Sequence, residues 1–452
     1  MRLPAKIVGA VVALLIVAVI GWNYYDVSIF FNWVKAAKQL SLLRIYEASV
    51  LFGESYRAVY PPLPILLFVA TARLSSRIVS YMHSVSEPGL LDFLLVAQPY
   101  IVKVLLKTPI IAAAIVIAIL LRRRFGDDAA FLALIGVPTL MTVGMLQFDT
   151  ILALFLYLAV VTLLAPTKRR EYIVLTSAAC LAIATLTKPI AAAFLLPILM
   201  YLPSKRERFM YLAAFSIIVL AASAPFLATE PRAFIENVLG FHLHRPPQYS
   251  SPWSIPALLA GYRQSVVDIL NILWIPVTAA AMALVMTRYR PRPGNEESLL
   301  LSTVMLGMCL LITIKVVNPD YFMWIYPLVI ALSFRVLKGG GLAKLYNVFS
   351  GIGIAWPAAS VIIPAIFSKP MYIQETESFV SAKNILMSSI SPPLNRILEN
   401  VMSAVGKKHV LHIAAAATYS HIYTAVGVTL IGCYLAIGIY LLLTLARRAC
   451  QP

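Results

Sequence analysis

Charged side chains are scarce in this chain, and their scarcity excludes a soluble fold. Asp, Glu, Lys and Arg make up 12% of the 452 residues, whereas hydrophobic residues make up 61%. A soluble protein of this length needs far more charge to cover its surface. The long apolar stretches must form helices, because membrane strands would read as short segments of alternating polarity. We therefore expect an all-α, polytopic transmembrane protein.

The sequence also lacks cysteine pairs with a recognisable spacing and motifs that bind nucleotides. The four cysteines, Cys180, Cys309, Cys433 and Cys450, are scattered, and no pair has the spacing of a zinc site or a disulfide framework. The chain has no glycine-rich phosphate loop and no convincing Asp-x-Asp motif, so a soluble nucleotide-sugar site is not indicated. No cofactor is implied, and a requirement for a divalent cation is left open.

Acidic residues are half as numerous as basic ones, 19 against 37, which gives a formal net charge of +18. This surplus does not indicate nucleic-acid binding, because 19 of the 37 basic residues fall in the N-terminus and in six short segments beside apolar stretches. The positive-inside rule places all of these segments in the cytoplasm. They are residues 2–6, 122–124, 168–170, 205–208, 288–292, 335–344 and 447–448.

Twelve apolar stretches fit this charge distribution as membrane spans, with both termini in the cytoplasm. They lie near residues 5–22, 97–121, 130–147, 150–165, 172–187, 189–203, 209–228, 266–287, 298–317, 321–335, 345–366 and 421–446. A thirteenth, 62–82, would reverse every later loop if it crossed the membrane, and it contains Arg73 and Arg77. We therefore expect it to form a juxtamembrane helix on the outer surface. No clear small-x-small site precedes Asp26, which favours a retained first span over a cleaved signal peptide.

Three segments on the outer face are then long, namely 23–96, 229–265 and 367–420. The inner loops are short, so chemistry or recognition is expected on the outer face. No internal repeat is visible in the sequence, which disfavours a transporter built from duplicated halves.

Asp26 is the acidic residue best placed for chemistry. It follows the first apolar stretch by a few residues, in Trp22-Asn-Tyr-Tyr-Asp26. A carboxylate at this boundary could act as a general base on a hydroxyl group, or it could cap the helix that begins beside it. An aromatic stretch and then Tyr60-Pro-Pro-Leu-Pro64 follow. Prolines suit a helix start and carry no function by themselves.

The ordered set of motifs resembles the GT-C superfamily of membrane glycosyltransferases, which take sugars from polyprenyl or dolichyl phosphates. In that superfamily an acidic residue follows the first span, and a proline motif opens a juxtamembrane helix. The other matching motifs are Gln147-Phe-Asp149, Thr187-Lys-Pro189, Phe241-His-Leu-His-Arg245, Gln248-Tyr-Ser-Ser-Pro-Trp253 and Asn318-Pro-Asp-Tyr-Phe-Met-Trp324. Their order is most similar to that in the catalytic subunits of GPI mannosyltransferase I. The match covers roughly residues 20–335, although the acidic residue is single and the loop 367–420 has no counterpart.

The resemblance implies an inverting transfer of a hexose, with mannose as the first candidate. The donor would be a polyprenyl- or dolichyl-phosphate sugar, and the acceptor a lipid-linked or glycan hydroxyl on the outer or lumenal face. Residues 1–265, with the outer loops 23–96 and 229–265, would form a catalytic transmembrane module. Residues 266–452, with the outer loop 367–420, would form a C-terminal transmembrane module.

The resemblance also assigns roles to individual side chains. Asp26 would deprotonate the acceptor hydroxyl as the catalytic base. Fixed cations would stabilise the leaving lipid phosphate, which gains negative charge as the glycosidic bond breaks. The donor-phosphate ligands would be Arg245, Lys188 and His244, and the acceptor- or sugar-binding residues would be Asp149, Gln147, Tyr60, Arg57, His242 and Tyr321.

Plainer interpretations stand beside these assignments. Interfacial Lys and Arg side chains commonly reach toward lipid headgroups, and Asp149 could simply end a helix in water. Tyr321, Trp324 and Tyr326 fit an interfacial aromatic belt better than a sugar platform. Asp320 is expected to be a solvated loop residue.

Two rival functions belong to other classes. A transporter or flippase for lipid-linked sugars would need charges near mid-span and an inverted repeat, and the sequence shows neither. A noncatalytic subunit that binds lipid-linked sugars would leave Asp26 as a helix cap. In every case the partners include membrane lipids and no nucleic acid. The sequence has no Asn-x-Ser/Thr sequon and no retention signal, which favours a prokaryotic plasma membrane over the ER membrane.

Overall fold

The structure is a computed structural model, and it describes residues 4–21, 23–85, 88–165, 169–336, 338–367 and 412–449. Nearly all of these residues are helical. Two short strands, β1 (Gln248–Tyr249) and β2 (Val316–Val317), pair in parallel, with Gln248 opposite Val316. The all-α fold expected from the apolar stretches is thus confirmed, and the small sheet has a local role in the site.

The first half of the chain runs from the first apolar helix to a long helix that ends at Thr229. Its helices are α1 (Ala5–Ile20), α2 (Tyr24–Gln39), η1 (Leu42–Glu47), α3 (Ala48–Phe52), η2 (Glu54–Tyr56), α4 (Pro62–Val85), α5 (Pro88–Phe125), α6 (Asp127–Ile135), α7 (Val137–Met145), α8 (Asp149–Leu163), α9 (Arg170–Thr187), η3 (Pro189–Phe194), α10 (Leu195–Tyr201) and α11 (Lys205–Thr229).

The second half begins with short helical turns and continues into long helices. Its helices are α12 (Pro231–Ile235), the π-helical turn η4 (Glu236–Gly240), α13 (Phe241–His244), α14 (Ser254–Leu259), α15 (Gln264–Arg288), α16 (Glu296–Thr313), η5 (Pro319–Met323), α17 (Tyr326–Val336), α18 (Gly341–Phe367) and α21 (His412–Ala449). The predicted outer loop 367–420 lies largely outside the described residues.

Each of the twelve predicted apolar stretches coincides with a helix or with a pair of consecutive helices. Among the described residues, seven helices are long and apolar enough to cross a membrane, or eight if a bent pair counts as one span. That pair is α6 and α7, which meet at an angle of 44°. The protein is therefore a polytopic membrane protein whose spans are partly broken or short.

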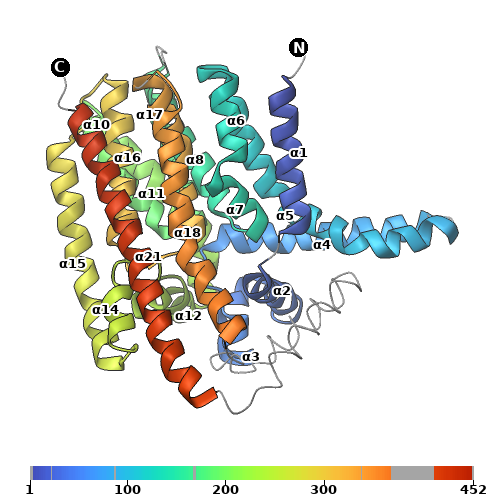
Figure 1. Cartoon of the computed structure of the whole chain (residues 1–452). Coiled ribbons are helices and arrows are strands. Elements are labelled where there is room, and N and C mark those ends of the chain that lie inside the picture. The colour runs from blue at the N-terminus through green and yellow to red at the C-terminus, as the bar shows by residue number, and fades with distance from the viewer. Residues whose placement is uncertain are drawn as a thin grey trace.

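The long helices run side by side, and both chain termini lie at one end of the bundle (Figure 1). The basic segments gather at this end, where ion pairs join Lys6 to Asp128 and Glu296 to both Arg124 and Arg335. We call it the basic end. Helices α2, α3, α12 and α14 lie at the opposite end (Figure 1). The charge segregation that the sequence predicts is therefore present in the fold.

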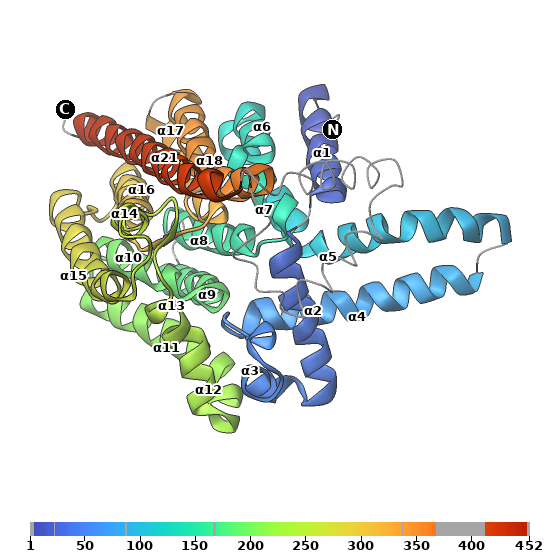
Figure 2. The ribbon, with the colours of Figure 1, turned by 60° about the horizontal axis from the view of Figure 1, so that its bottom comes forward.

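Helix α4 does not run parallel to the other long helices. It is apolar enough to count as a candidate span, but it lies across the other helices in Figure 1 and projects sideways beside the first part of α5 in Figure 2. This arrangement is the one predicted for a juxtamembrane helix at 62–82. Arg73 and Arg77 are exposed on it.

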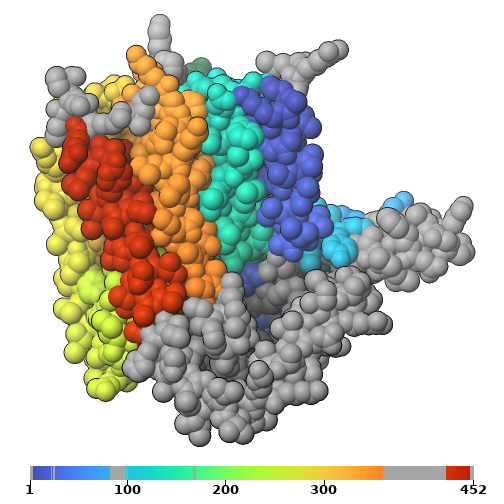
Figure 3. Space-filling model, in the orientation of Figure 1, coloured from blue at the N-terminus to red at the C-terminus, as the bar shows by residue number. Residues whose placement is uncertain are grey.

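Side chains on the outside of the bundle are mostly apolar. Phe209, Leu220, Ile272 and Leu284 on α11 and α15 are 60–74% exposed, as expected for surfaces that contact lipid. On the face shown in Figure 3, α21, α18, the pair α6 and α7, and α1 lie side by side. The polar residues described next are enclosed by this apolar shell.

Candidate active site

Breaks between helices bring polar side chains together at the end of the bundle opposite the basic end. Asp26 lies in the first turn of α2, just after the break from α1. Gln147 lies in the break between α7 and α8, and Asp149 is the first residue of α8. The other side chains in this group are Lys188 between α9 and η3, Arg245 after α13, and Asp320 in η5. Helix ends suit this purpose, because their unpaired backbone groups already require polar surroundings.

Asp26 is held by two amide side chains. Its Oδ2 atom accepts hydrogen bonds from Asn23 Nδ2 at 2.6 Å and from Gln147 Nε2 at 2.5 Å. Asn23 also caps α2, because its Oδ1 accepts from the backbone N–H of Asp26 at 3.3 Å. The alternative that Asp26 is the helix cap is therefore wrong, and its carboxylate points toward other elements.

The half-buried position of Asp26 changes its acidity. Burial raises the pKa of its carboxyl group to about 6, and the negative charge of Asp320 adds to the rise. The hydrogen bond from Gln147 and the positive charges of Arg245 and Lys188 oppose it. A carboxylate with a pKa near neutral pH is both ionised and basic enough to take a proton.

The left-handed backbone conformation of Leu146 sets the position of Gln147. Leu146 ends α7 with φ +57°, and the Gln147 N–H donates to Thr142 O at 2.9 Å. The side-chain amide then reaches Asp26. Its Oε1 atom is buried and accepts no hydrogen bond from any residue that the structure describes, which is uncommon for a buried oxygen.

The crossing of α1 and α7 fixes the distance between Asp26 and its amide partner. A carbon added at Gly21 would lie 2.7 Å from the Cα atom of Gly144, so the two backbones touch. Lys107 of α5 is fully buried there, and its Nζ donates to the carbonyls of Ala18 at 2.9 Å, Gly21 at 2.5 Å and Gly144 at 2.8 Å. One cation thus ties together the C-terminal ends of two helices. The expectation that the spans carry no charge near their middle is therefore wrong, because Lys107 lies within the predicted span 97–121.

Lys188 is the centre of a buried ion cluster. Its Nζ lies 2.7 and 2.8 Å from the two carboxylate oxygens of Asp149 and 2.9 Å from Asp320 Oδ2. Trp324 Nε1 also donates to Asp149, at 2.5 Å. Asp149 therefore does not end a helix in water, and Asp320 is not the solvated residue that we expected. Asp320 is 3% exposed because it supplies the second charge to a buried lysine.

Aromatic rings enclose this cluster. The Lys188 ammonium lies 4.4 Å from the ring centroid of Tyr321 and 5.6 Å from that of Tyr60. Tyr321 stacks on Trp324 with centroids 4.2 Å apart, and Tyr326 is fully buried. The predicted interfacial belt is therefore wrong, because these three side chains pack inside the protein rather than facing lipid headgroups.

The segment 241–253 brings Arg245 to the site. It is fastened to the end of α16 by the β1–β2 pair and by Trp253 Nε1, which donates to Thr313 O at 2.6 Å. Arg245 Nε donates to Gln248 Oε1 at 2.6 Å, and the guanidinium lies over the rings of Phe241 and Tyr249 at 5.7 and 5.9 Å. Among the described residues, no carboxylate lies within ion-pair distance of it.

His242 and His244, the two histidines of this segment, differ in their burial and in their contacts. His242 Nε2 lies 3.2 Å from Val59 O, and burial together with the charge of Arg245 lowers the pKa of His242 to about 4. His242 is therefore neutral at neutral pH and serves as a hydrogen-bonding group rather than a cation. His244 is exposed at the end of α13, and no described side chain ties it to the cluster.

Arg57 contacts the same ring, that of Phe241, as Arg245 does. Its guanidinium is 5.5 Å from the Phe241 ring centroid, and it pairs with Glu54 at 2.8 Å. Its carbonyl accepts from Trp33 Nε1 at 3.2 Å. The aromatic stretch after Asp26 thus packs directly against the segment before the proline motif. Trp33 and Tyr60 rings are 5.8 Å apart.

Lys315 is a site residue that the sequence did not reveal. It is 2% exposed, and its Nζ donates to Leu243 O at 2.5 Å and to Asn271 Oδ1 at 2.7 Å. Both partners are neutral, so a buried cation adjoins Arg245 without a carboxylate among the described residues. The signal was a lysine within the apolar stretch 298–317, which is costly unless it faces polar groups or a ligand.

Among the described residues, no group of three or more His, Cys, Asp or Glu side chains is arranged to hold a metal ion. The site can instead combine a half-buried base, a set of fixed cations and aromatic surfaces at the edge of an apolar bundle. Such groups can take a proton from a hydroxyl and stabilise developing negative charge.

Such a site in a polytopic helical bundle defines a class of membrane transferase. The sequence model of glycosyltransferase family 87 matches residues 58–313, more than half of the chain. The chain therefore belongs to glycosyltransferase family 87, a family of GT-C-type membrane glycosyltransferases. No curated protein matches the sequence. The matched range contains Gln147, Lys188 and Arg245 but ends before Asp320 and begins after Asp26.

Proposed function

We propose that the protein transfers a hexose, with mannose as the first candidate, from a polyprenyl- or dolichyl-phosphate sugar to an acceptor hydroxyl, with inversion. The acceptor is a lipid-linked sugar or a glycan on the outer or lumenal face of the membrane. One observation supports this most: the half-buried Asp26 carboxylate is anchored by two amides beside cations on separate elements.

Asp26 acts as the general base in this proposal. The acceptor hydroxyl attacks the anomeric carbon as its proton passes to the carboxylate, and the bond from that carbon to the phosphate oxygen breaks. The pKa of about 6 leaves Asp26 ionised at neutral pH. Inversion follows because the attacking oxygen and the leaving phosphate occupy opposite faces of the sugar.

Arg245 is the proposed direct ligand of the donor phosphate. Its neighbours are the Gln248 amide and two aromatic rings, so its charge is available to an anion, and its planar fork can bind two phosphate oxygens. A phosphate that reached Lys188 would share it with Asp149 and Asp320. Lys188 is therefore a weaker phosphate ligand than Arg245, because two carboxylates already balance its charge, and His244 would meet the phosphate from the solvent side.

The acceptor-binding part of the proposal rests on Gln147 and the aromatic rings. The buried Oε1 of Gln147 can accept a hydrogen bond from the acceptor beside the base. The half-buried ring of Tyr60 flanks the cluster and can contact a sugar, whereas Tyr321 is packed between Trp324 and Lys188 and supports the site from beneath. His242 and Arg57 border the same space, and Asp149 keeps Lys188 in place rather than touching the acceptor.

The test is transfer of radiolabelled sugar from a synthetic lipid-phosphate donor by the purified protein. Replacing Asp26 by Asn keeps the size and one oxygen that can accept from Asn23 and Gln147. It turns the other oxygen into an NH2 group and removes the base, so the rate is expected to fall about 100-fold or more. Asp268→Asn is the matched control, because Asp268 is exposed on α15. Equal rates for wild type and D26N would refute the general base. Transfer that requires a nucleotide sugar would refute the donor assignment.

A second pair of variants tests the phosphate ligand. Arg245→Gln is expected to raise the KM for the lipid-phosphate donor and to lower kcat, by about tenfold or more together, because the leaving phosphate loses a charge-assisted ligand. Arg232→Gln removes an arginine that is 89% exposed in its side chain and should have no effect. If the two variants behave alike, Arg245 does not bind the donor.

A further inference from the structure

A group of arginines at the basic end stands apart from the proposed active site. Arg288 ends α15, Arg290 and Arg292 lie in the turn before α16, and Arg208 lies in the first turn of α11. These four arginines, with Met200, Pro291 and Pro293, line a cavity of about 340 Å³. We call it the arginine cleft. No acidic residue is among the described residues that line it.

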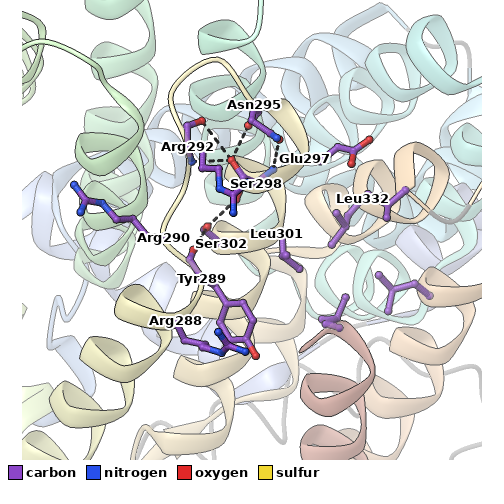
Figure 4. A pocket seen from close by; sticks show the side chains of 13 residues that line it. Arg288, Tyr289, Arg290, Arg292, Asn295, Glu297, Ser298, Leu301, Ser302 and Leu332 are labelled. Atoms are coloured by element: carbon purple, nitrogen blue, oxygen red, sulfur yellow. Dashed lines mark hydrogen bonds between the residues drawn. The ribbon is translucent and has the colours of Figure 1, made fainter. Parts of the chain in front are cut away.

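A second cavity, of about 290 Å³, lies beside the first. It shares Arg288, Arg290 and Arg292, and its opposite wall is apolar, made of Leu301, Leu332, Val336, Leu342 and Leu445 from α16, α17, α18 and α21. Figure 4 shows the arginine-bearing turn and Tyr289 on one side and Leu332 on the other. The same three arginines therefore border both cavities, and the second cavity adds an apolar wall.

Among the described residues, no acid lies within ion-pair distance of Arg290 or Arg292 in the arginine cleft. Glu296 lies within ion-pair distance of Arg124 and Arg335, and Glu207 lies 3.5 Å from Arg170. Glu297 lines the second cavity and lies 4.0 Å from Arg335. The acids at this end are thus engaged with other arginines.

The backbone beneath the arginines is fixed. The Arg292 N–H donates to Ser298 Oγ at 2.8 Å, and Ser298 N–H donates to Asn295 Oδ1 at 2.9 Å. Ser302 Oγ donates to Tyr289 O one turn further along α16. Figure 4 shows these bonds holding the turn against the start of the helix. The arginine side chains therefore extend from a fixed backbone, which lowers the conformational entropy lost when they bind a ligand.

The position of the cleft identifies the kind of ligand. It lies where the candidate spans Gln264–Arg288 and Glu296–Thr313 end, which is the level of lipid headgroups. Phosphate is the anion that arginines bind best with two oxygens, and an acyl chain suits the leucine wall. We propose that the arginine cleft binds the headgroup phosphate of an anionic phospholipid, with one acyl chain against Leu301 and Val336, the two half-buried residues of the apolar wall.

This lipid is distinct from the sugar donor. The arginine cleft lies at the basic end, whereas α2, which carries Asp26, lies at the opposite end of the bundle (Figure 1). The proposal therefore stands whatever sugar the enzyme transfers. It concerns a structural or regulatory lipid in the leaflet at the basic end.

The experiment measures binding of fluorescent phosphatidylglycerol to the full chain in phosphatidylcholine nanodiscs. The variant Arg290→Gln with Arg292→Gln is expected to bind about thirtyfold more weakly, from the contribution of each arginine to an anionic lipid surface. The control, Arg123→Gln with Arg206→Gln, removes the same charge from other segments at the same end and should change binding less than twofold. Equal thermal unfolding of both variants in phosphatidylcholine alone shows that the fold is retained.

Two further results decide the ligand. Unlabelled phosphatidylglycerol should displace the probe, and glycerol phosphate at the same concentration should not. If the control variant lost as much binding, the loss would depend on net charge alone, and the proposed lipid site would be refuted. Displacement by glycerol phosphate as effective as by the lipid would assign the cleft to a soluble phosphate compound and overturn the lipid assignment.

Discussion

At the scale of single residues, the acidity of Asp26 is set by opposing neighbours. Burial and Asp320 raise its pKa to about 6, whereas Gln147, Arg245 and Lys188 lower it. If the ionised form is the base, kcat/KM should rise with pH and reach half its plateau near pH 6. The measurement is a pH profile of sugar transfer with saturating acceptor. A flat profile between pH 5 and 8 would contradict the assignment.

Replacing Asp320 should shift this pH profile to lower pH. Its negative charge raises the pKa of Asp26, so Asp320→Asn should shift the half-maximum to a pH below 6. Lys188 keeps Asp149 as a partner in this variant. A shift to higher pH would show that Asp320 acts on Asp26 mainly through the position of Lys188. Asp128→Asn, at the basic end, should leave the profile unchanged.

At the scale of helices, the contact between α1 and α7 controls the relative position of base and amide. A methyl group at Gly21 would lie 2.7 Å from Gly144 Cα and 2.9 Å from its carbonyl, both backbone atoms that cannot yield easily. Gly21→Ala should therefore destabilise the protein by roughly 1–3 kcal/mol and lower kcat. Gly9→Ala on the same helix meets no atom within 4 Å and should be neutral or slightly stabilising. Thermal unfolding and transfer assays compare the two.

Lys107 acts on the same crossing. Replacing it by Met leaves the carbonyls of Ala18, Gly21 and Gly144 without their shared donor, so kcat should fall about tenfold or more while the KM for donor changes little. Lys103→Met, one turn earlier on α5, is the matched control because it also removes a largely buried lysine. Equal effects of the two variants would mean that Lys107 only supports the general fold.

Apolar stretches and helix breaks could be read from the sequence because they depend on local composition. Asp26, Gln147, Lys188 and Arg245 could be singled out because each follows or precedes such a break. The side chains that these residues contact were not predictable in the same way. The pairing of Lys188 with Asp320 joins residues 132 positions apart, and no local pattern encodes it. Burial of Tyr326 likewise depends on which helix covers it.

At the scale of the whole molecule, the fold separates a basic end from the end that carries Asp26. Cysteines placed at Arg123 and at Arg232, in a chain whose native cysteines are replaced by Ser, should therefore react with a membrane-impermeant maleimide from opposite sides of sealed vesicles. The positive-inside rule assigns position 123 to the cytoplasmic side. Labelling of both positions from one side would contradict the transmembrane arrangement.

The anchoring of Asp26 through one oxygen has a consequence for selectivity. Both amides bind Oδ2, and among the described residues no hydrogen bond reaches Oδ1. Under the proposed function, the proton must be taken by Oδ1, from a hydroxyl that also lies near Gln147. An acceptor sugar carries several hydroxyls of similar reactivity, but few can reach that oxygen while the ring fits between the surrounding aromatics. The linkage that the enzyme makes is then decided by the orientation of one carboxylate rather than by the chemistry of the sugar.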